Sequence, residues 1–125
     1  MGRNTEIVES FITAWGSNDI DRIMTYFDAD CVYHNIPVEA VRGTDAIRAV
    51  IEGFAGAATA IEWILHHVAE TDGGVVLTER TDRFEIGGRW IDLPVMGSFV
   101  LRGEKIVEWR DYFDMKQFTD QMSGG

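Results

Sequence analysis

The 125-residue sequence predicts an α+β fold, in which helices in the first half of the chain precede a mostly antiparallel sheet in the second half. Two observations predict this order. Apolar residues recur at helical spacing up to about residue 55, and from about residue 60 they alternate with polar residues, as in strands that bury one face. We expect the helices to pack on the concave face of a curved sheet.

Three helices are expected before the sheet. Their apolar stripes recur every three or four residues and cover 7–15, 20–27 and 44–54. The residues expected to cap their N-termini are Asn4 or Thr5, Asn18 or Asp19, and Thr44. A short strand over 31–37, which Pro37 ends, is expected between the second and third helices.

Four strands and a short final helix are expected in the second half. The strands cover 61–69, 74–86, 89–101 and 105–114, and glycine-containing turns separate them. The final helix covers 116–122. A chain of this length can build one substantial core, so residues 1–125 are expected to form a single domain.

Charge and composition exclude several classes of function. The formal net charge of −10 repels nucleic acid and anionic membranes, so neither is an expected partner, whereas a small neutral ligand is compatible with it. The apolar runs are too short to cross a bilayer, and the N-terminal residues lack the apolar segment of a secretory signal. Cys31, the single cysteine, can form no internal disulfide, which fits a cytoplasmic protein.

Arg80 and Asp82 lie among apolar residues on the inner side of the second expected strand. A two-residue turn at 87–88 would pair this strand with the next and place Arg83 opposite Asp92 on the outer face. These opposite charges support that register. The inner face of the next strand is then continuously apolar and consists of Ile91, Leu93, Val95, Gly97, Phe99 and Leu101.

Asp111, in the last strand, is expected on the same inner face. A three-residue turn over 102–104 pairs Asp111 with Val95, whereas a two-residue turn would direct Asp111 outward. Arg80 also pairs with Val95, so Arg80, Val95 and Asp111 would form one row across three adjacent strands. An arginine side chain can span that row.

Two carboxyl groups and one guanidinium in an apolar wall predict acid–base chemistry. For a single charged residue inside a sheet, a structural ion pair is the commoner explanation. A second carboxylate without a partner, however, costs several kcal/mol in a dry site unless it holds a proton. One proton shared by the two groups leaves one ionised and one neutral, and this places a general base beside a general acid.

Three motifs in this order resemble those of the limonene epoxide hydrolases. They are Tyr33-His34-Asn35, Arg80-Thr81-Asp82 and Trp109-Arg110-Asp111-Tyr112-Phe113. The resemblance covers most of the chain. It implies that the curved sheet forms the cone that this family shares with nuclear transport factor 2 and SnoaL-like proteins, with about three N-terminal helices on its concave face.

The resemblance also implies a one-step hydrolysis of an epoxide that needs no metal or organic cofactor. Asp82 would act as the base toward a water that Tyr33 and Asn35 help to hold. Asp111 would protonate the epoxide oxygen, and Arg80 would orient both carboxyl groups. The expected apolar substrate wall consists of Phe84, Leu93, Val95 and Phe113.

The remaining tryptophans and histidines are expected to have structural roles. Trp15 and Trp63 are interpreted as packing residues. Trp90 falls on the outer face near Pro94 and Met96, where an apolar patch suggests a dimer contact, and family members are similar in forming homodimers. Neighbouring strand residues point to opposite faces, so His66 and His67 are not expected to share a metal ion, and the same alternation turns His34 away from Tyr33 and Asn35.

Two other functions are compatible with the same pattern. A ketosteroid isomerase-like or polyketide cyclase-like enzyme of this fold would use one Asp to move a proton next to a carbonyl and a neutral acid to stabilise the oxyanion. The arginine between two carboxyl groups favours hydrolysis over that reaction. In a non-catalytic binding module, the polar cluster would only orient a small ligand.

Overall fold

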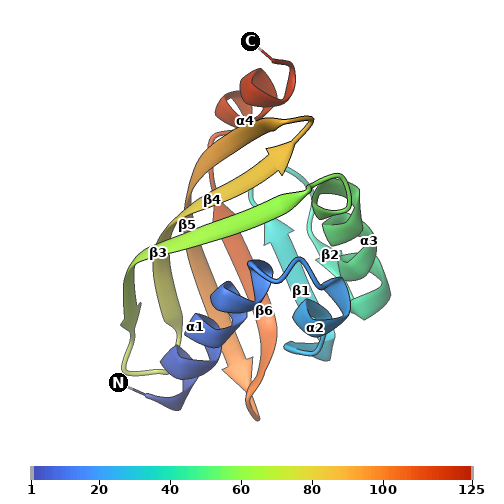
Figure 1. The fold of residues 1–125 in the computed structure, drawn as a ribbon. Helices are drawn as coiled ribbons and strands as arrows, with labels where there is room; N and C mark the ends of the chain where they lie inside the picture. The colour runs from blue at the N-terminus through green and yellow to red at the C-terminus, as the bar shows by residue number, and fades with distance from the viewer. Residues whose placement is uncertain (1, 125) are drawn as a thin grey trace.

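The computed structural model describes residues 2–124, with Phe54 described by its backbone only. The elements in chain order are α1 (Arg3–Trp15), α2 (Ile20–Met24), β1 (Phe27–Asn35), β2 (Val41–Arg42), α3 (Thr44–Ala55), β3 (Ala60–Glu70), β4 (Val76–Ile86), β5 (Arg89–Arg102), β6 (Lys105–Tyr112) and α4 (Met115–Met122). A curved six-stranded sheet wraps around α1, while α3 lies beside β1 and β2 and α4 lies at the far end of β4 and β5 (Figure 1). The predicted α+β class is confirmed.

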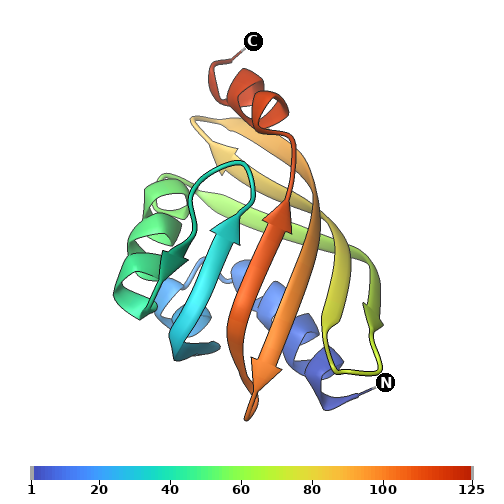
Figure 2. The ribbon, with the colours of Figure 1, turned by 180° about the vertical axis from the view of Figure 1, so that it is seen from behind.

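The sheet has the strand order β2-β1-β6-β5-β4-β3. Its pairs are antiparallel except for β1 and β6, which run parallel because the chain crosses the whole sheet between them. From behind, β1, β6 and β5 lie in front with no helix over them, and α1 is seen beyond them (Figure 2). The sheet therefore has one face covered by helix and one open face. Among the described residues, no helix is long and apolar enough to cross a membrane.

The core lies between α1 and the covered face of the sheet. Phe11, in the middle of α1, is fully buried and meets the ring of Trp109 from β6 edge to face at 5.0 Å and that of Phe99 from β5 at 5.9 Å. Trp15, one turn later, stacks on Trp63 from β3 at 4.0 Å. Burying an aromatic side chain of this size stabilises the fold by roughly 2 to 3 kcal/mol. These contacts hold α1 against the strands that carry the polar cluster.

The predicted caps of the first and third helices are wrong. α1 begins at Arg3 after Gly2, because Asn4 and Thr5 use their side chains elsewhere. The Asn4 amide donates to the Gly74 carbonyl at 2.9 Å, and the Thr5 hydroxyl donates to Glu70 at 2.6 Å, so both residues tie the helix to the β3–β4 hairpin.

The starts of α2 and α3 agree only in part with the prediction. The cap of α2 at Asp19 is confirmed, since its carboxylate accepts from the Arg22 N–H. α3 is preceded by Gly43, whose φ of 89° suits glycine, and Thr44 is its first residue. The second helix is shorter than predicted, because Phe27 pairs with Ile106 in the sheet and starts β1.

The turn between β5 and β6 also differs from the prediction. Arg102 pairs with Lys105, so the turn has two residues, Gly103 and Glu104, with φ of 56° and 69°. Positive φ at both positions is typical of a tight type I′ hairpin turn.

A bulge in β6 then restores the inward direction of Asp111. The register shifts by one residue after Leu101, so Asp111 lies opposite Gly97 and not opposite Val95. The predicted row through Val95 is wrong, but the predicted face is right. The two-residue turn and the extra residue of the bulge together move the pairing by two positions, which keeps Trp109 and Asp111 on the inner face. Before the bulge the expectation is wrong, because Ile106 is buried in the core and Val107 is only half-buried.

Candidate active site

Strand alternation brings the charged residues onto the covered face of the sheet. Arg80 and Asp82 are two residues apart on β4, and Asp111 lies on β6, one strand beyond β5. Their exposed fractions are 1%, 4% and 3%. The pairing of Arg80 with Val95, of Asp82 with Leu93 and of Arg83 with Asp92 is confirmed. Three ionisable groups therefore lie close together in the buried interior on this face.

The Arg80 guanidinium binds both carboxyl groups. Its Nε and Nη2 donate to the two oxygens of Asp82 at 2.9 and 2.8 Å, and its Nη1 and Nη2 donate to the two oxygens of Asp111 at 3.2 and 2.7 Å. Nη1 also donates to the Thr78 hydroxyl at 3.2 Å. All its N–H groups are thus used, which fixes the orientation of the guanidinium and of both aspartates.

Gly97 leaves the space in which Arg80 and Asp111 meet. A Cβ atom at this position would lie 2.5 Å from Arg80 Nη1, 2.8 Å from Asp111 Oδ1 and 2.8 Å from Thr78 Oγ1. Real Cβ atoms do not approach other heavy atoms so closely, so a side chain here is incompatible with the cluster. From the sequence, Gly97 was interpreted only as one member of an apolar face.

Two tryptophans complete the cluster. The Trp109 indole N–H donates to Asp111 Oδ1 at 2.7 Å. The ring of Trp63 lies under the Arg80 guanidinium, with 4.8 Å between Cζ and the ring centroid, an arrangement that favours the positive charge. Trp63 was interpreted as a packing residue. In the structure it pairs with Asp82, two residues from Arg80 on β4, and this pairing places it at the site.

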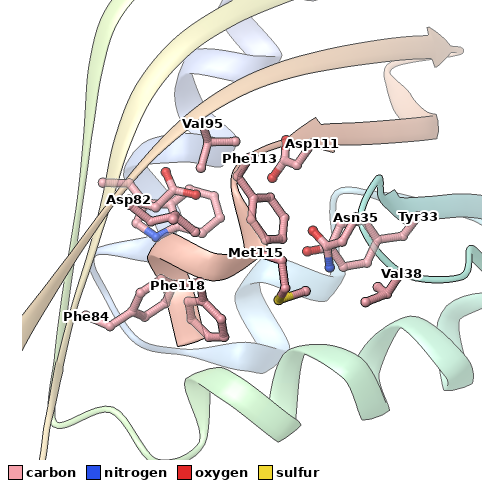
Figure 3. A pocket seen from close by; sticks show the side chains of 12 residues that line it. Tyr33, Asn35, Val38, Asp82, Phe84, Val95, Asp111, Phe113, Met115 and Phe118 are labelled. Atoms are coloured by element: carbon pink, nitrogen blue, oxygen red, sulfur yellow. The ribbon is translucent and has the colours of Figure 1, made fainter. Parts of the chain in front are cut away.

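Tyr33 and Asn35 reach the site from β1. The parallel pairing of β1 with β6 sets Tyr33 beside Trp109 and Asn35 beside Asp111. The Tyr33 ring stacks on the Trp109 ring at 4.2 Å, and only 3% of Tyr33 is exposed. Tyr33, Asn35 and Asp111 lie on one side of the cavity, and Asp82 lies across it (Figure 3). The structure thus brings together all five polar residues singled out in the sequence.

Burial controls the protonation of the cluster. It raises the pKa of Asp82 to about 6, although the charge and hydrogen bonds of Arg80 act in the opposite direction. Burial lowers the pKa of Arg80, but the two carboxylates outweigh this and raise it, so the guanidinium stays charged. The pKa of Tyr33 is raised well above its usual value by burial and next by the charge of Asp111, so its phenol stays protonated.

A cavity of about 140 Å³ opens beside the carboxyl groups. Asp82, Asp111, Tyr33 and Asn35 line it at its polar end, and Arg80 lies behind the two aspartates. The four predicted wall residues all line it, together with four that were not predicted. The lining side chains outside the polar end are Val38, Trp63, Phe84, Leu93, Val95, Phe113, Met115 and Phe118.

Met115 and Phe118 belong to α4, whose position beyond the end of the sheet the sequence did not indicate. Their spacing of three residues places them on one face of that helix, and this was the available signal. Phe118 also meets Phe113 edge to face at 6.5 Å. Helix α4 therefore forms one wall of the cavity (Figure 3).

The other candidate groups lie away from the cavity. His66 contacts the Thr81 hydroxyl, His34 contacts the Val38 carbonyl, and no group of three His, Cys, Asp or Glu side chains in residues 2–124 is arranged to hold a metal ion. Burial raises the pKa of Cys31 to about 12, so its thiol is unreactive near neutral pH.

Comparisons with known proteins agree with this geometry. A family model described as the limonene-1,2-epoxide hydrolase catalytic domain matches residues 2–123. The chain is 33% identical over 108 residues to the epoxide hydrolase EphG of Mycobacterium tuberculosis, an alignment that covers 86% of this chain and 71% of the relative.

Solved structures are similar along the whole chain. One is an M. tuberculosis LEH-like epoxide hydrolase, with 30% identity, a TM-score of 0.81 and coverage of 98% of this chain and 90% of the other. A SnoaL-like polyketide cyclase from Shewanella putrefaciens has a TM-score of 0.83 at 17% identity, with coverage of 100% and 88%. The second likeness concerns the fold alone, and it confirms the expected cone.

Proposed function

Because the chain belongs to the limonene-1,2-epoxide hydrolase family, we propose that it converts an apolar, terpene-like or cyclic epoxide to a vicinal diol in one step, with water as the nucleophile and without a cofactor. The observation that carries this proposal is the Arg80 guanidinium held between two buried carboxyl groups at the polar end of an otherwise apolar cavity. A strained ring opens readily only when a base activates the nucleophile while an acid protonates the leaving oxygen.

We assign the base role to Asp111, opposite to the expectation from the sequence. Asn35 pairs with Asp111 in the sheet, and the Asp111 charge affects Tyr33 more than the Asp82 charge does, so the groups expected to hold the water lie at Asp111. Asp111 also accepts a hydrogen bond from the Trp109 indole N–H in addition to those from Arg80, and these bonds orient its carboxyl group.

Asp82 is then the acid. Within residues 2–124 its carboxyl group accepts hydrogen bonds from Arg80 alone, and burial raises its pKa to about 6. An apolar epoxide in the cavity excludes further water, which favours the neutral acid more strongly. Phe84, which lies two residues along β4 on the same face, places apolar surface next to the reacting oxygen.

Two protons move in the proposed step. Asp111 takes a proton from water, the water oxygen bonds to one ring carbon, the C–O bond to that carbon breaks, and the freed oxygen takes the proton of Asp82. The product is a diol with one oxygen from water. The proton on Asp111 then returns to Asp82, and Arg80 stays charged between them throughout.

Turnover of a cyclic apolar epoxide in heavy-oxygen water tests the reaction. With enzyme in excess, a single turnover should place the heavy oxygen in the diol. Heavy oxygen in an enzyme carboxylate would instead indicate an ester intermediate formed by direct attack. If the protein converts none of the epoxides to a diol but isomerises an unsaturated ketosteroid, the isomerase function is favoured.

Azide as an added nucleophile distinguishes the carboxyl group that acts as the base from the one that acts as the acid. Azide needs no base, so Asp111→Asn should lose hydrolysis but still form an azido alcohol when azide is added. Asp82→Asn lacks the acid and should gain little from azide. Rescue of Asp82→Asn but not of Asp111→Asn would reverse the assignment. If both variants change only ligand affinity and the unmodified protein is inactive, the chain is a binding module.

We also propose that the protein is a cytoplasmic homodimer of single-domain subunits. The large apolar side chains on the open face of the sheet support the dimer, and the single buried Cys31 is compatible with a reducing compartment.

A further inference from the structure

The edge of β5 beside α4 has no neighbouring strand over its first half. Within residues 2–124, β4 pairs with β5 from Arg89 onward, whereas the pairing of β6 with β5 ends at Met96. Asp92 lies in the half that β6 leaves uncovered. Backbone N–H and C=O groups on such an edge have no strand partner and are available to other groups.

The Gln121 side chain takes the place of a strand at this edge. Its Oε1 accepts from the Asp92 N–H at 2.9 Å, and its Nε2 donates to the Asp92 C=O at 2.8 Å. A residue of an antiparallel partner strand would make this same pair of bonds. The Arg89 guanidinium adds a third bond, from Nη2 to the Gln121 backbone carbonyl at 3.1 Å.

Besides these bonds, Phe118 of α4 meets Phe113, and little else among the described residues holds the helix to the molecule. None of its residues is buried, and its contacts with the rest of the fold are chiefly with β5. Met115 and Phe118 are half-buried and line the cavity on the face of α4 that points inward (Figure 3). Gln121 lies three residues beyond Phe118, so the bond to Asp92 fixes the helix turn that carries this aromatic wall.

We propose that Gln121 is a positioning residue that docks α4 on the β5 edge and thereby sets the size of epoxide that the cavity admits. The proposal rests on the epoxide hydrolase function proposed above. Gln121 is not among the residues that line the cavity. Its effect should therefore appear in substrate binding and in size selectivity, and not in the chemical step.

Limited proteolysis tests the docking. Trypsin cleaves after Lys116, which is exposed on α4 but protected while the helix is formed and docked. Gln121→Ala removes both bonds to Asp92 and raises helix propensity, so helix melting is not the cause of any effect. Cleavage at Lys116 should accelerate about tenfold, the change that the loss of one or two net hydrogen bonds produces. Gln117→Ala, which removes an exposed amide from the same helix, should cleave at the normal rate.

Steady-state kinetics test the consequence. For a small cyclic epoxide, Gln121→Ala should raise KM about fivefold with kcat within about twofold, and the ratio of kcat/KM for a bulky epoxide to that for the small one should rise. Gln121→Glu keeps the acceptor for the Asp92 N–H but loses the donor, so it should lie between Gln121→Ala and the unmodified protein.

Three outcomes would overturn the proposal. An unchanged cleavage rate would show that Gln121 does not dock α4. Faster cleavage with unchanged KM values and an unchanged size preference would show that the docked helix does not select substrate. A parallel loss of kcat for both epoxides would place Gln121 in the chemical step. An unmodified protein that opens no epoxide contradicts the proposed function instead, and the cleavage rates still report the docking.

Discussion

At the scale of single residues, the proposed role of Asp82 as the acid predicts that activity depends on pH. The proposed mechanism needs the acid form of Asp82, and burial raises the pKa of Asp82 to about 6, so this form is lost as the pH rises through about 6. We predict that kcat/KM falls about tenfold per pH unit above that point. The fall in kcat should come at higher pH, because bound substrate excludes water from Asp82. Initial rates from about pH 5 to about pH 8 test this, and a flat kcat/KM profile contradicts it.

Gly97 gives a second prediction at the residue scale. In Gly97→Ala the new methyl group would collide with Arg80 and Asp111, so the carboxyl groups must move apart. We expect kcat/KM to fall by about a hundredfold or more, since misplacement of reacting groups by about 1 Å costs that much. Gly53→Ala is the matched control, because a Cβ there meets nothing within 4 Å. It should keep full activity and stabilise α3 by about 1 kcal/mol. Equal activity of the two variants would show that Gly97 is not needed for space.

The strands show at the scale of elements how far the sequence could predict the site. The alternation of Trp109 and Asp111 predicted the inner face of β6 at the site, but nearer the turn the bulge buries Ile106 and leaves Val107 half-buried. The register could not be predicted, since a tight turn with a bulge and a three-residue turn give Asp111 the same direction. The hydrogen bonds between α4 and β5 could not be predicted either. They join the Gln121 amide to backbone groups of Asp92, and such bonds leave no apolar pattern in the sequence.

Helix α4 carries the prediction at this scale. The Asp114 carboxylate caps the helix by accepting from the N–H groups of Lys116 and Gln117. Asp114→Ala should destabilise α4 by about 1 kcal/mol, so its amides should exchange with deuterium roughly fivefold faster while those of β5 and β6 keep their rates. Asp120→Ala removes an exposed carboxylate that pairs with Lys116 and should change little. Unchanged α4 exchange in Asp114→Ala would mean that the cap does not limit helix opening.

For the whole molecule, the open face of the sheet predicts self-association. Met96 is 53% exposed and lies between Glu79 and Tyr112 in neighbouring strands, and Trp90 is 39% exposed on the same face of β5. The face has no helix over it in Figure 2. Large apolar side chains on an uncovered sheet are typical of a subunit interface. Two copies that each carry a net charge of −10 repel one another, so added salt should strengthen the dimer.

Light scattering after size-exclusion chromatography tests this prediction. The unmodified protein should have twice the mass of one chain, and Met96→Lys should have the mass of a single chain because the new charge would be buried in the interface. The substitution makes the net charge less negative, so greater repulsion between subunits cannot explain the dissociation. Met122→Lys makes the same change at an exposed methionine on α4 and should remain dimeric. If the unmodified protein has the mass of a single chain even at high salt, the open face is not a dimer interface. If Met96→Lys is still a dimer, the interface lies elsewhere on the molecule.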